Sequence, residues 1–319
     1  MSKFLEEHAA EVRAAANRIQ PHVRRTPVLR TDLSPELRLK AECFQVTGSF
    51  KARGAFNAVL SLIERGPRPE GVIAVSSGNH AQALALAART VGLPALILIP
   101  ADANPAKVAA TRALGAEVMQ EGITFANREQ RLREVMAERQ LTLVHPFDDW
   151  NVIHGQGTAA RELLEDEPDL EVITAPVGGG GILSGTALSS KSHNAKIRVI
   201  GVEPAAADDA YRSWKTGRIE TLDKAPSTLA DGVRATAIGK RTFEVMFGQG
   251  LVDQIVTVTE EEIAAAVVLA WTRLHLALEP TGALPLAAFS AGKLGGGRAG
   301  LVLTGGNANL ETVAKLLGT

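Results

Sequence analysis

Short apolar runs alternate with longer helical segments along most of the chain, and this alternation restricts the fold more than any other feature. Each run is bounded by Gly or Pro residues or by polar clusters and is too short to be a free-standing helix. Alternation of this kind is typical of βαβ units, so we expect an α/β fold with parallel sheets buried on both faces. The strand-like runs are residues 71–77, 94–100, 142–147, 172–178, 197–203 and 300–306.

The length of the chain and two of its connecting segments suggest a division into domains. A chain of 319 residues exceeds what a single hydrophobic core usually holds. Residues 64–71 combine Pro, Gly and charged residues, as linkers do, and a second boundary is expected near residues 145–151. We predict a large domain from residues 1–61 and 149–319, and a small domain from residues 62–148.

Composition excludes several classes of partner. The 34 Lys and Arg residues nearly balance the 35 Asp and Glu residues, so no net field attracts nucleic acid or an anionic membrane. A single cysteine, Cys43, rules out an internal disulfide framework and a multi-cysteine metal site. The N-terminus lacks the apolar core of a secretory signal, and no uncharged run is long enough to span a membrane. We expect a cytoplasmic protein that binds small molecules or copies of itself.

Four consecutive glycines, Gly178, Gly179, Gly180 and Gly181, end the fourth strand-like run and precede a helical segment. A loop without side chains lets backbone amides approach a phosphate at the positive end of a helix. The alternative is a plain flexible turn, but a turn does not need four glycines. The loop lacks the Lys-Ser/Thr ending of a nucleotide-binding loop and the G-x-G-x-x-G spacing. A phosphorylated cofactor without a triphosphate is therefore the better prediction.

Polar residues also follow two other strand-like runs, where ligands of parallel α/β sheets bind. The first group could receive a carboxylate on its backbone amides, although Ser and Asn are also ordinary turn and capping residues. After the last run, Thr304 would place a hydroxyl in the same crevice. The first group consists of Ser76, Ser77, Gly78, Asn79 and His80.

Seven motifs in a fixed order resemble one known family. They are "TGSFKARGA", "SSGNHAQA", "PVGGGGILSG", "GVEPAAADDA", "LADGVR", "EPTGALPLAA" and "TGGN". The chain resembles the pyridoxal-phosphate enzymes of the tryptophan-synthase β-subunit fold, within the threonine dehydratase and serine racemase branch. The resemblance runs from residue 24 to residue 310. It implies two open, twisted, mostly parallel sheets with flanking helices, and a homodimer. It also implies that the large domain binds pyridoxal phosphate and that the small domain is mobile.

The resemblance assigns cofactor roles to residues of this chain. It implies that Lys51 binds pyridoxal phosphate covalently and that Phe50 packs beside the ring. Thr304 would face the pyridine nitrogen with a hydroxyl, which favours elimination over transamination. The remaining cofactor contacts implied are Asn79 to the ring 3′ oxygen, Gly178, Gly179, Gly180 and Gly181 to the phosphate, and Gly232 and Glu279 near the ring.

The resemblance also implies a substrate and a reaction. The loop from Ser76 to His80 would hold the carboxylate of an amino acid, with help from Arg128. Lys51 would remove the α-proton of L-threonine or L-serine, giving 2-oxobutyrate or pyruvate and ammonia. Ser77, opposite the lysine, could instead return a proton and invert the α-carbon. Serine racemase and 3-hydroxyaspartate dehydratase are therefore the alternatives to a threonine/serine dehydratase.

A cation site is implied in the segment "GVEPAAADDA". Relatives use equivalents of Glu203, the Ala207 carbonyl and Asp209 to hold Mg²⁺, Mn²⁺ or Ca²⁺. Without the resemblance, a solvated acidic loop would be the simpler interpretation. Because the chain ends twelve residues after Asn307, we expect no C-terminal regulatory domain. A non-enzymatic binding protein on the same fold is conceivable, but the presence of Lys51 favours an enzyme.

Overall fold

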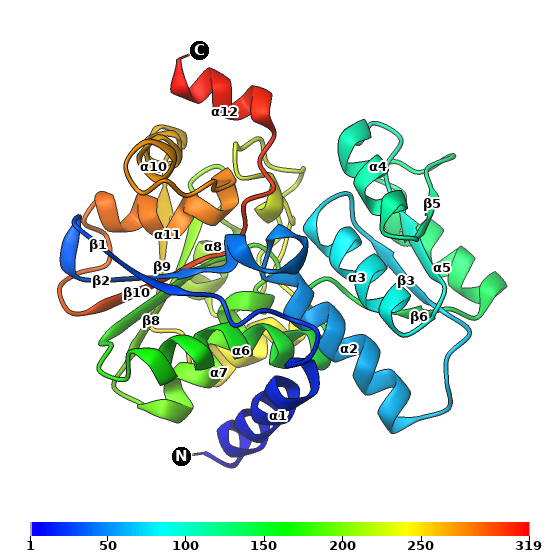
Figure 1. Cartoon of the computed structure of the whole chain (residues 1–319), viewed down its shortest axis with the longest axis horizontal. Coiled ribbons are helices and arrows are strands. Elements are labelled where there is room, and N and C mark those ends of the chain that lie inside the picture. Colours follow the sequence, from blue (N-terminus) through cyan, green and yellow to red (C-terminus); the bar gives the residue numbers. More distant parts are fainter. Residues whose placement is uncertain (1, 319) are drawn as a thin grey trace.

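The computed structural model describes residues 2–318 and contains two β-sheets that lie side by side (Figure 1). The larger has six strands in the order β1-β2-β10-β7-β8-β9, and the smaller has four in the order β5-β4-β3-β6. Every neighbouring pair is parallel except β1 with β2. The predicted α/β fold with two mostly parallel sheets and flanking helices is therefore confirmed.

The strands of the large sheet come from both ends of the chain, and those of the small sheet come from its middle. The large sheet contains β1 (Val28–Thr31), β2 (Ser34–Ala41), β7 (Val172–Pro176), β8 (Arg198–Pro204), β9 (Gln254–Val258) and β10 (Ala299–Leu303). The small sheet contains β3 (Val72–Val75), β4 (Ala95–Leu98), β5 (Glu117–Met119) and β6 (Thr142–Leu143). All four of its strands lie within residues 62–148, while the mobility of that segment stays a prediction.

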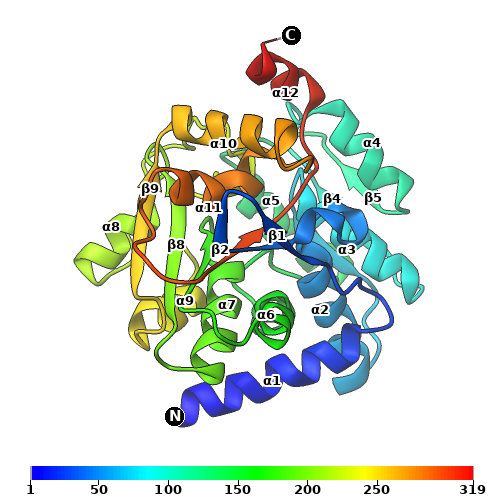
Figure 2. The ribbon, with the colours of Figure 1, turned by 60° about the vertical axis from the view of Figure 1, so that its left-hand side comes forward.

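Helices cover both faces of the large sheet. In Figure 2, α6 (Trp150–Asp166) and α7 (Gly181–His193) lie on one side, and α10 (Glu260–Thr272) and α11 (Pro280–Ser290) lie on the other. The other helices are α1 (Lys3–Ile19), α2 (Lys51–Arg65), α3 (Asn79–Thr90), α4 (Pro105–Ala113), α5 (Arg128–Arg139), α8 (Asp209–Thr216), α9 (Lys240–Phe243) and α12 (Leu310–Leu317), with short turns η1 (Glu42–Phe44), η2 (Val46–Gly48), η3 (Asp231–Val233) and η4 (Glu244–Gly248).

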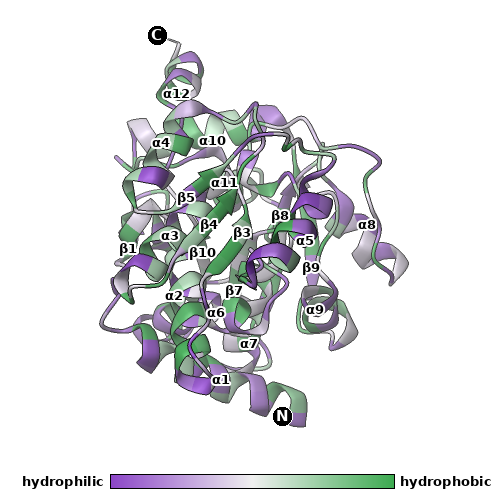
Figure 3. Cartoon of the chain, turned by 90° about the vertical axis from the view of Figure 1, so that its right-hand side faces the viewer, coloured by the Kyte–Doolittle hydropathy of each residue, from purple (hydrophilic) through white to green (hydrophobic). Residues whose placement is uncertain are grey.

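Burial explains why the apolar runs form strands. All residues of β4, β7 and β10 are buried, and the central strands stand out as hydrophobic in Figure 3. Strands buried on both faces need continuous rather than alternating apolar residues. Each of the six predicted runs contains a strand, whereas β1, β2, β5 and β9 were not predicted. Among the described helices, none is long and apolar enough to cross a membrane.

Candidate active site

A cavity of about 780 Å³ lies beyond the carboxyl ends of β3, β7 and β10 and is lined by residues from both sheets. In parallel α/β folds this end of the sheet is where ligands bind. Residues predicted to bind cofactor or substrate all line it. They are Phe50, Lys51, Ser76, Ser77, Gly78, Asn79, His80, Arg128, Gly178, Gly179, Gly180, Gly181, Gly232, Glu279 and Thr304.

Lys51 is the first residue of α2 and places its amine in this cavity. Its Nζ donates a hydrogen bond to the Pro146 carbonyl oxygen at 2.7 Å and lies 5.1 Å from the centre of the Phe50 ring. Burial lowers the pKa of the Lys51 amine to about 8, because a desolvated ammonium is disfavoured. A sizeable fraction of the side chain is therefore a neutral amine near physiological pH, as a nucleophile or proton acceptor must be.

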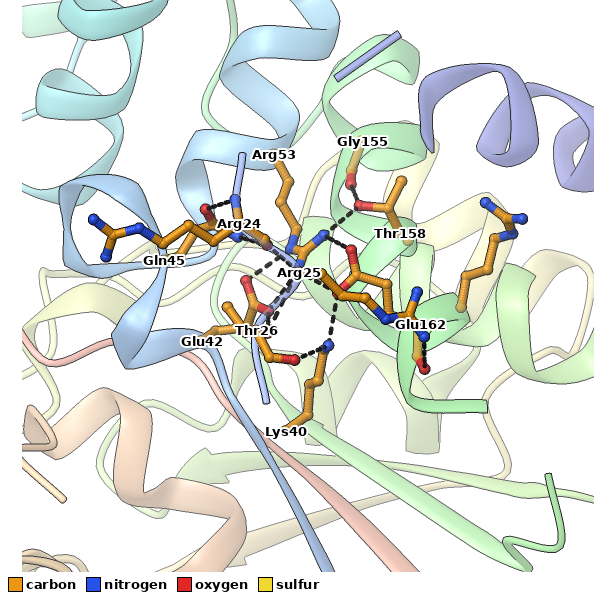
Figure 4. Close-up of polar contacts among 12 residues, drawn as sticks. Arg24, Arg25, Thr26, Lys40, Glu42, Gln45, Arg53, Gly155, Thr158 and Glu162 are labelled. Carbon is orange, nitrogen blue, oxygen red and sulfur yellow. Dashed lines mark hydrogen bonds and ion pairs between the residues drawn. The ribbon is translucent and has the colours of Figure 1, made fainter. Parts of the chain in front are cut away.

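A buried ion network holds the start of α2 in place (Figure 4). Arg53 is two residues after Lys51 and so projects from a different face of the helix. Its fully buried guanidinium donates to both carboxylate oxygens of Glu42, at 2.8 Å each, and to those of Glu162 on α6 at 2.7 and 2.8 Å. Lys40 on β2 donates to Glu162 at 2.6 Å and to the Thr26 carbonyl at 2.7 Å. Two cations and two carboxylates thus fix α2 against α6 and β2.

The tetraglycine loop connects β7 to α7. Within the part of the chain that the structure describes, no acceptor is hydrogen-bonded to the amides of Gly178, Gly179 or Gly180. Gly180 has a φ of 91°, which favours glycine. A Cβ on Gly179 would overlap the Phe147 ring, so any side chain there would force that ring to move. Free amides at a helix N-terminus suit a phosphate group.

Thr304 contributes a buried hydroxyl that, among the described residues, has no hydrogen-bond partner. Its own carbonyl accepts from the Phe50 amide at 3.0 Å, which places the residue beside the Lys51 segment. Buried polar groups are normally satisfied, so the free hydroxyl indicates space for a ligand atom. Nearby, Asn79 Nδ2 donates to Glu279 at 2.7 Å, and burial raises the pKa of that carboxyl to about 7.

The predicted carboxylate loop lies between β3 and α3. The Ser77 side chain is exposed, and no described residue is hydrogen-bonded to its hydroxyl. His80 donates from Nε2 to the Val144 carbonyl at 2.9 Å, and burial lowers its pKa to about 3, so the imidazole is neutral. Arg128 begins α5, where its guanidinium lies 3.5 Å from the centre of the Phe125 ring. Desolvation lowers the pKa of Arg128.

Three cavity residues were missed by the sequence analysis. Lys107 on α4 forms an ion pair with Asp231 in η3, which joins the two sides of the cavity. Nothing local in the sequence distinguishes Lys107, but Asp231 precedes Gly232 in the motif "LADGVR". His145 also lines the cavity. It lies within the strand-like run 142–147 and begins the segment 145–151, which we interpreted only as a domain boundary.

The predicted cation residues lie outside this cavity. Glu203 is the penultimate residue of β8 and accepts from the amides of Ala210 at 3.2 Å and Tyr211 at 2.6 Å. Asp209 begins α8, and its buried Oδ2 has no partner among the described residues. Burial raises the pKa of Glu203, and it raises that of Asp209 to about 7. Among residues 2–318, no three His, Cys, Asp or Glu side chains form a metal site. Two carboxylates with the Ala207 carbonyl nonetheless suit a hard cation.

The residues of the cavity fit one cofactor. A desolvated lysine, free amides at a helix N-terminus and an unpartnered hydroxyl match the aldehyde, the phosphate and the ring nitrogen of pyridoxal phosphate. Fold and site together define an enzyme of the fold-type II class that uses this cofactor. The chain belongs to the family described as "Pyridoxal-phosphate dependent enzyme", whose sequence profile matches residues 19–305.

Comparison with known proteins places the chain among ammonia-lyases and racemases. It is 42% identical to an L-threo-3-hydroxyaspartate ammonia-lyase from a Pseudomonas species, over 96% of this chain and 97% of the relative. It is 40% identical to a serine racemase from Schizosaccharomyces pombe, covering 96% of each chain. The solved structure of a T.th. threonine deaminase superposes with a TM-score of 0.89 at 46% identity, covering 94% of this chain and 98% of that one.

Proposed function

We propose that the protein is a threonine/serine ammonia-lyase. It would convert L-threonine to 2-oxobutyrate and ammonia, and L-serine to pyruvate and ammonia. The observation that carries the proposal is the pairing of a desolvated Lys51 amine with the neutral hydroxyl of Thr304 in one cavity. Similarity to the threonine deaminase, at 46% identity, supports the choice of substrates.

The residues of this chain have separable roles in that reaction. When bound, pyridoxal phosphate withdraws electrons from the α-carbon of an amino acid attached to it. Lys51 in its neutral form would accept the α-proton, and the β-hydroxyl would leave, so that the proton and the hydroxyl together make up the one water that is lost. The dehydrated product is then hydrolysed to the keto acid and ammonia. This hydrolysis consumes one water, which equals the water lost with the β-hydroxyl, so the net products are ammonia and the keto acid. Thr304 offers a neutral hydrogen bond where a carboxylate would favour transamination.

A second candidate substrate is L-threo-3-hydroxyaspartate. Arg128 supports it, because a guanidinium in the cavity suits the additional carboxylate of that substrate. The Pseudomonas relative carries the corresponding activity in its name. Serine racemase is the remaining alternative, and the exposed Ser77 hydroxyl supports it.

The test supplies the holoenzyme separately with L-threonine, L-serine, D-serine and L-threo-3-hydroxyaspartate. Keto acid is measured, and the enantiomer of the recovered substrate is determined. We expect keto acid fastest from L-threonine, and none from the Lys51→Ala variant. D-serine accumulating from L-serine with little pyruvate would instead identify a racemase. Keto acid from hydroxyaspartate alone would favour the second candidate.

We further propose that Glu203, the Ala207 carbonyl and Asp209 bind a divalent cation. The unpartnered Asp209 Oδ2 and the burial of both carboxylates support this site. Chelator-treated protein should gain thermal stability on addition of Mg²⁺, Mn²⁺ or Ca²⁺, because a ligand that binds only the folded state stabilises it. Asp209→Asn should abolish that gain. An equal gain in wild type and variant would place the cation elsewhere.

A further inference from the structure

His145 follows β6 at the edge of the cavity, and its Nδ1 is occupied by the backbone of its own turn. The amide of Asp148 donates to Nδ1 at 2.9 Å, and that of Phe147 donates at 3.4 Å. Because a backbone amide can only donate, Nδ1 is an unprotonated acceptor. The single proton of the neutral imidazole is therefore on Nε2.

The Nε2–H group is available to a ligand. Nδ1 faces the turn, so Nε2 lies on the far side of a ring that lines the cavity. Of the groups that the structure describes, none is hydrogen-bonded to Nε2. Desolvation lowers the pKa of His145, although the nearby Asp148 and Glu129 carboxylates oppose this shift, and the lowered pKa favours the neutral ring. The Phe147 ring, 4.6 Å away between centroids and nearly perpendicular, restricts rotation of the imidazole.

The position of His145 beside the carboxylate loop follows from the register of the small sheet. β6 pairs with β3, so the residues after both strands are neighbours. The Val144 amide donates to Ile73 on β3 at 3.0 Å, and the Val144 carbonyl accepts from His80 in the loop at 2.9 Å. His145 is the next residue. His145 is therefore close in the fold to the segment predicted to hold the substrate carboxylate, and its side chain lines the same cavity as that segment.

We propose that His145 binds the α-carboxylate of the substrate through a hydrogen bond donated by Nε2–H. The inference rests on the proposed function, because it assigns a further residue to the same amino-acid site. The neutral Nε2–H group would add one hydrogen-bond donor to the loop amides that are predicted to bind the carboxylate. It would do so without placing a positive charge beside Lys51. A second cation there would lower the pKa of the Lys51 amine still further.

Two substitutions distinguish the effect of the Nε2–H donor from the effect of the Nδ1 acceptor that holds the turn. His145→Asn keeps an acceptor at the position of Nδ1 but removes the donor at Nε2. His145→Gln places an amide N–H near the position of Nε2. The probes are glycine, which has a carboxylate but no leaving group, and methylamine, which has no carboxylate. Binding of each to the holoenzyme is measured by calorimetry and by the change in cofactor absorbance.

We expect H145N to weaken glycine binding by about ten- to a hundredfold, the usual effect of losing a hydrogen bond to a charged group. Methylamine binding should stay unchanged, and H145Q should recover most of the affinity for glycine. Unchanged glycine binding by H145N would overturn the proposal. Equal weakening of both probes would also overturn it, because it would indicate general damage to the cavity.

A measurement on the wild-type enzyme covers the case in which the variants do not fold. In protein labelled with ¹⁵N-histidine, the His145 Nε2–H resonance should shift downfield with glycine and not with methylamine. An Nε2–H resonance that ignores glycine would overturn the proposal. If the wild type binds glycine through His145 but yields no keto acid from any amino acid tested, the proposed function fails and the assignment of His145 stands.

Discussion

Ser77 is the residue that we expect to separate the lyase activity from the racemase activity in this cavity. Its hydroxyl is exposed in the cavity, whereas the neighbouring Ser76 hydroxyl accepts from the Gly78 amide at 3.3 Å and so belongs to the loop. If Ser77 exchanges a proton with the α-carbon, Ser77→Ala should slow interconversion of L- and D-serine by about 10²- to 10⁴-fold. Elimination from L-serine should persist, because the proposed reaction needs only Lys51 to accept the α-proton.

Chiral chromatography of recovered serine, together with a pyruvate assay, measures both reactions in one sample. Ser76→Ala serves as the matched control, since it changes the same loop without removing the free hydroxyl. A Ser77→Ala enzyme that loses both reactions in equal proportion would show that Ser77 binds the substrate rather than transferring a proton.

Individual site residues could be predicted where a short sequence motif indicated their chemical role. The glycines at 178–181 and the lysine at a helix start belong to short motifs, so the sequence sufficed to place them in one site. Lys107 and Asp231 are 124 positions apart, and no local pattern predicts that they form an ion pair. His145 lies in a predicted strand-like run, but the hydrogen bonds that leave its Nε2 donor free depend on the fold of its turn.

The ion pair between Lys107 and Asp231 joins α4 to η3 across the cavity. Both side chains are partly exposed, so the pair should contribute little to the stability of the protein. Its position predicts a role in closing α4 over a bound substrate. We expect Lys107→Met to raise KM several-fold with an almost unchanged melting temperature, and high salt to raise the wild-type KM as well, since exposed pairs are screened.

Steady-state kinetics at low and high salt test this role. The charge-reversed double variant K107D/D231K should bind substrate better than either single variant, because it restores an attractive pair. If K107D alone matches the wild type in KM, the pair has no part in closure.

The Arg53 network makes a different prediction for the elements around it. Arg53→Met would leave the fully buried Glu42 and the largely buried Glu162 with one fewer cation. Removing one partner of a buried ion pair typically costs about 3–5 kcal/mol, because the remaining charge is uncompensated. We expect a fall of that size in the free energy of unfolding, with weaker cofactor binding because α2 also carries Lys51.

Urea unfolding compares this variant with Arg218→Met. Arg218 forms an exposed pair with Glu220 at 2.8 Å, so its loss should change the free energy of unfolding little. If both variants unfold at the same urea concentration, the buried network does not stabilise α2.

The same network explains why one element was missed. In β2 the residues Leu37, Arg38, Leu39 and Lys40 alternate apolar and charged side chains, which usually indicates a strand with one solvated face. All four are buried here, because Lys40 pairs with Glu162 at 2.6 Å and Arg38 pairs with Glu167 at 2.9 Å. A sequence typical of an edge strand thus forms a buried interior strand, because carboxylates from distant parts of the chain pair with its charged side chains. Only the fold brings these carboxylates next to β2.

At the scale of the whole molecule, the sequence predicted the two sheets but not how their carboxyl ends meet. The cavity has one wall from the loop after β3 and another from the glycine loop after β7. A hydrogen bond from Asn307, which follows β10, to Asn79 at the start of α3, at 2.8 Å, links the ends of the two sheets across 228 positions. Parallel sheets direct ligands to their carboxyl ends, but the packing of α2, α3 and α6 decides that the two ends share one site.

Buried neutral histidines should make the whole molecule sensitive to acid. His154 on α6 is 4% exposed, and its Nε2 lies 2.8 Å from Nδ1 of His8 on α1. Burial, with the nearby His8, lowers the pKa of His154 from 6.5 to about 3. Below pH 6.5 the unfolded chain therefore binds a proton that the folded chain excludes. Above pH 6.5 this histidine does not change the free energy of unfolding. As the pH falls from 6.5 toward 3, the free energy of unfolding decreases by about 1.4 kcal/mol per pH unit.

His154→Gln tests this linkage, because the glutamine amide can still donate to His8 while it cannot take up a proton. We expect the free energy of unfolding of this variant to fall less steeply between pH 6.5 and 4.5 than that of the wild type, by about 1.4 kcal/mol per pH unit. The exposed His193 provides the control, and His193→Gln should retain the wild-type slope. Equal slopes for His154→Gln and the wild type would mean that the acid sensitivity arises elsewhere, with His80, whose pKa burial also lowers to about 3, as the next residue to substitute.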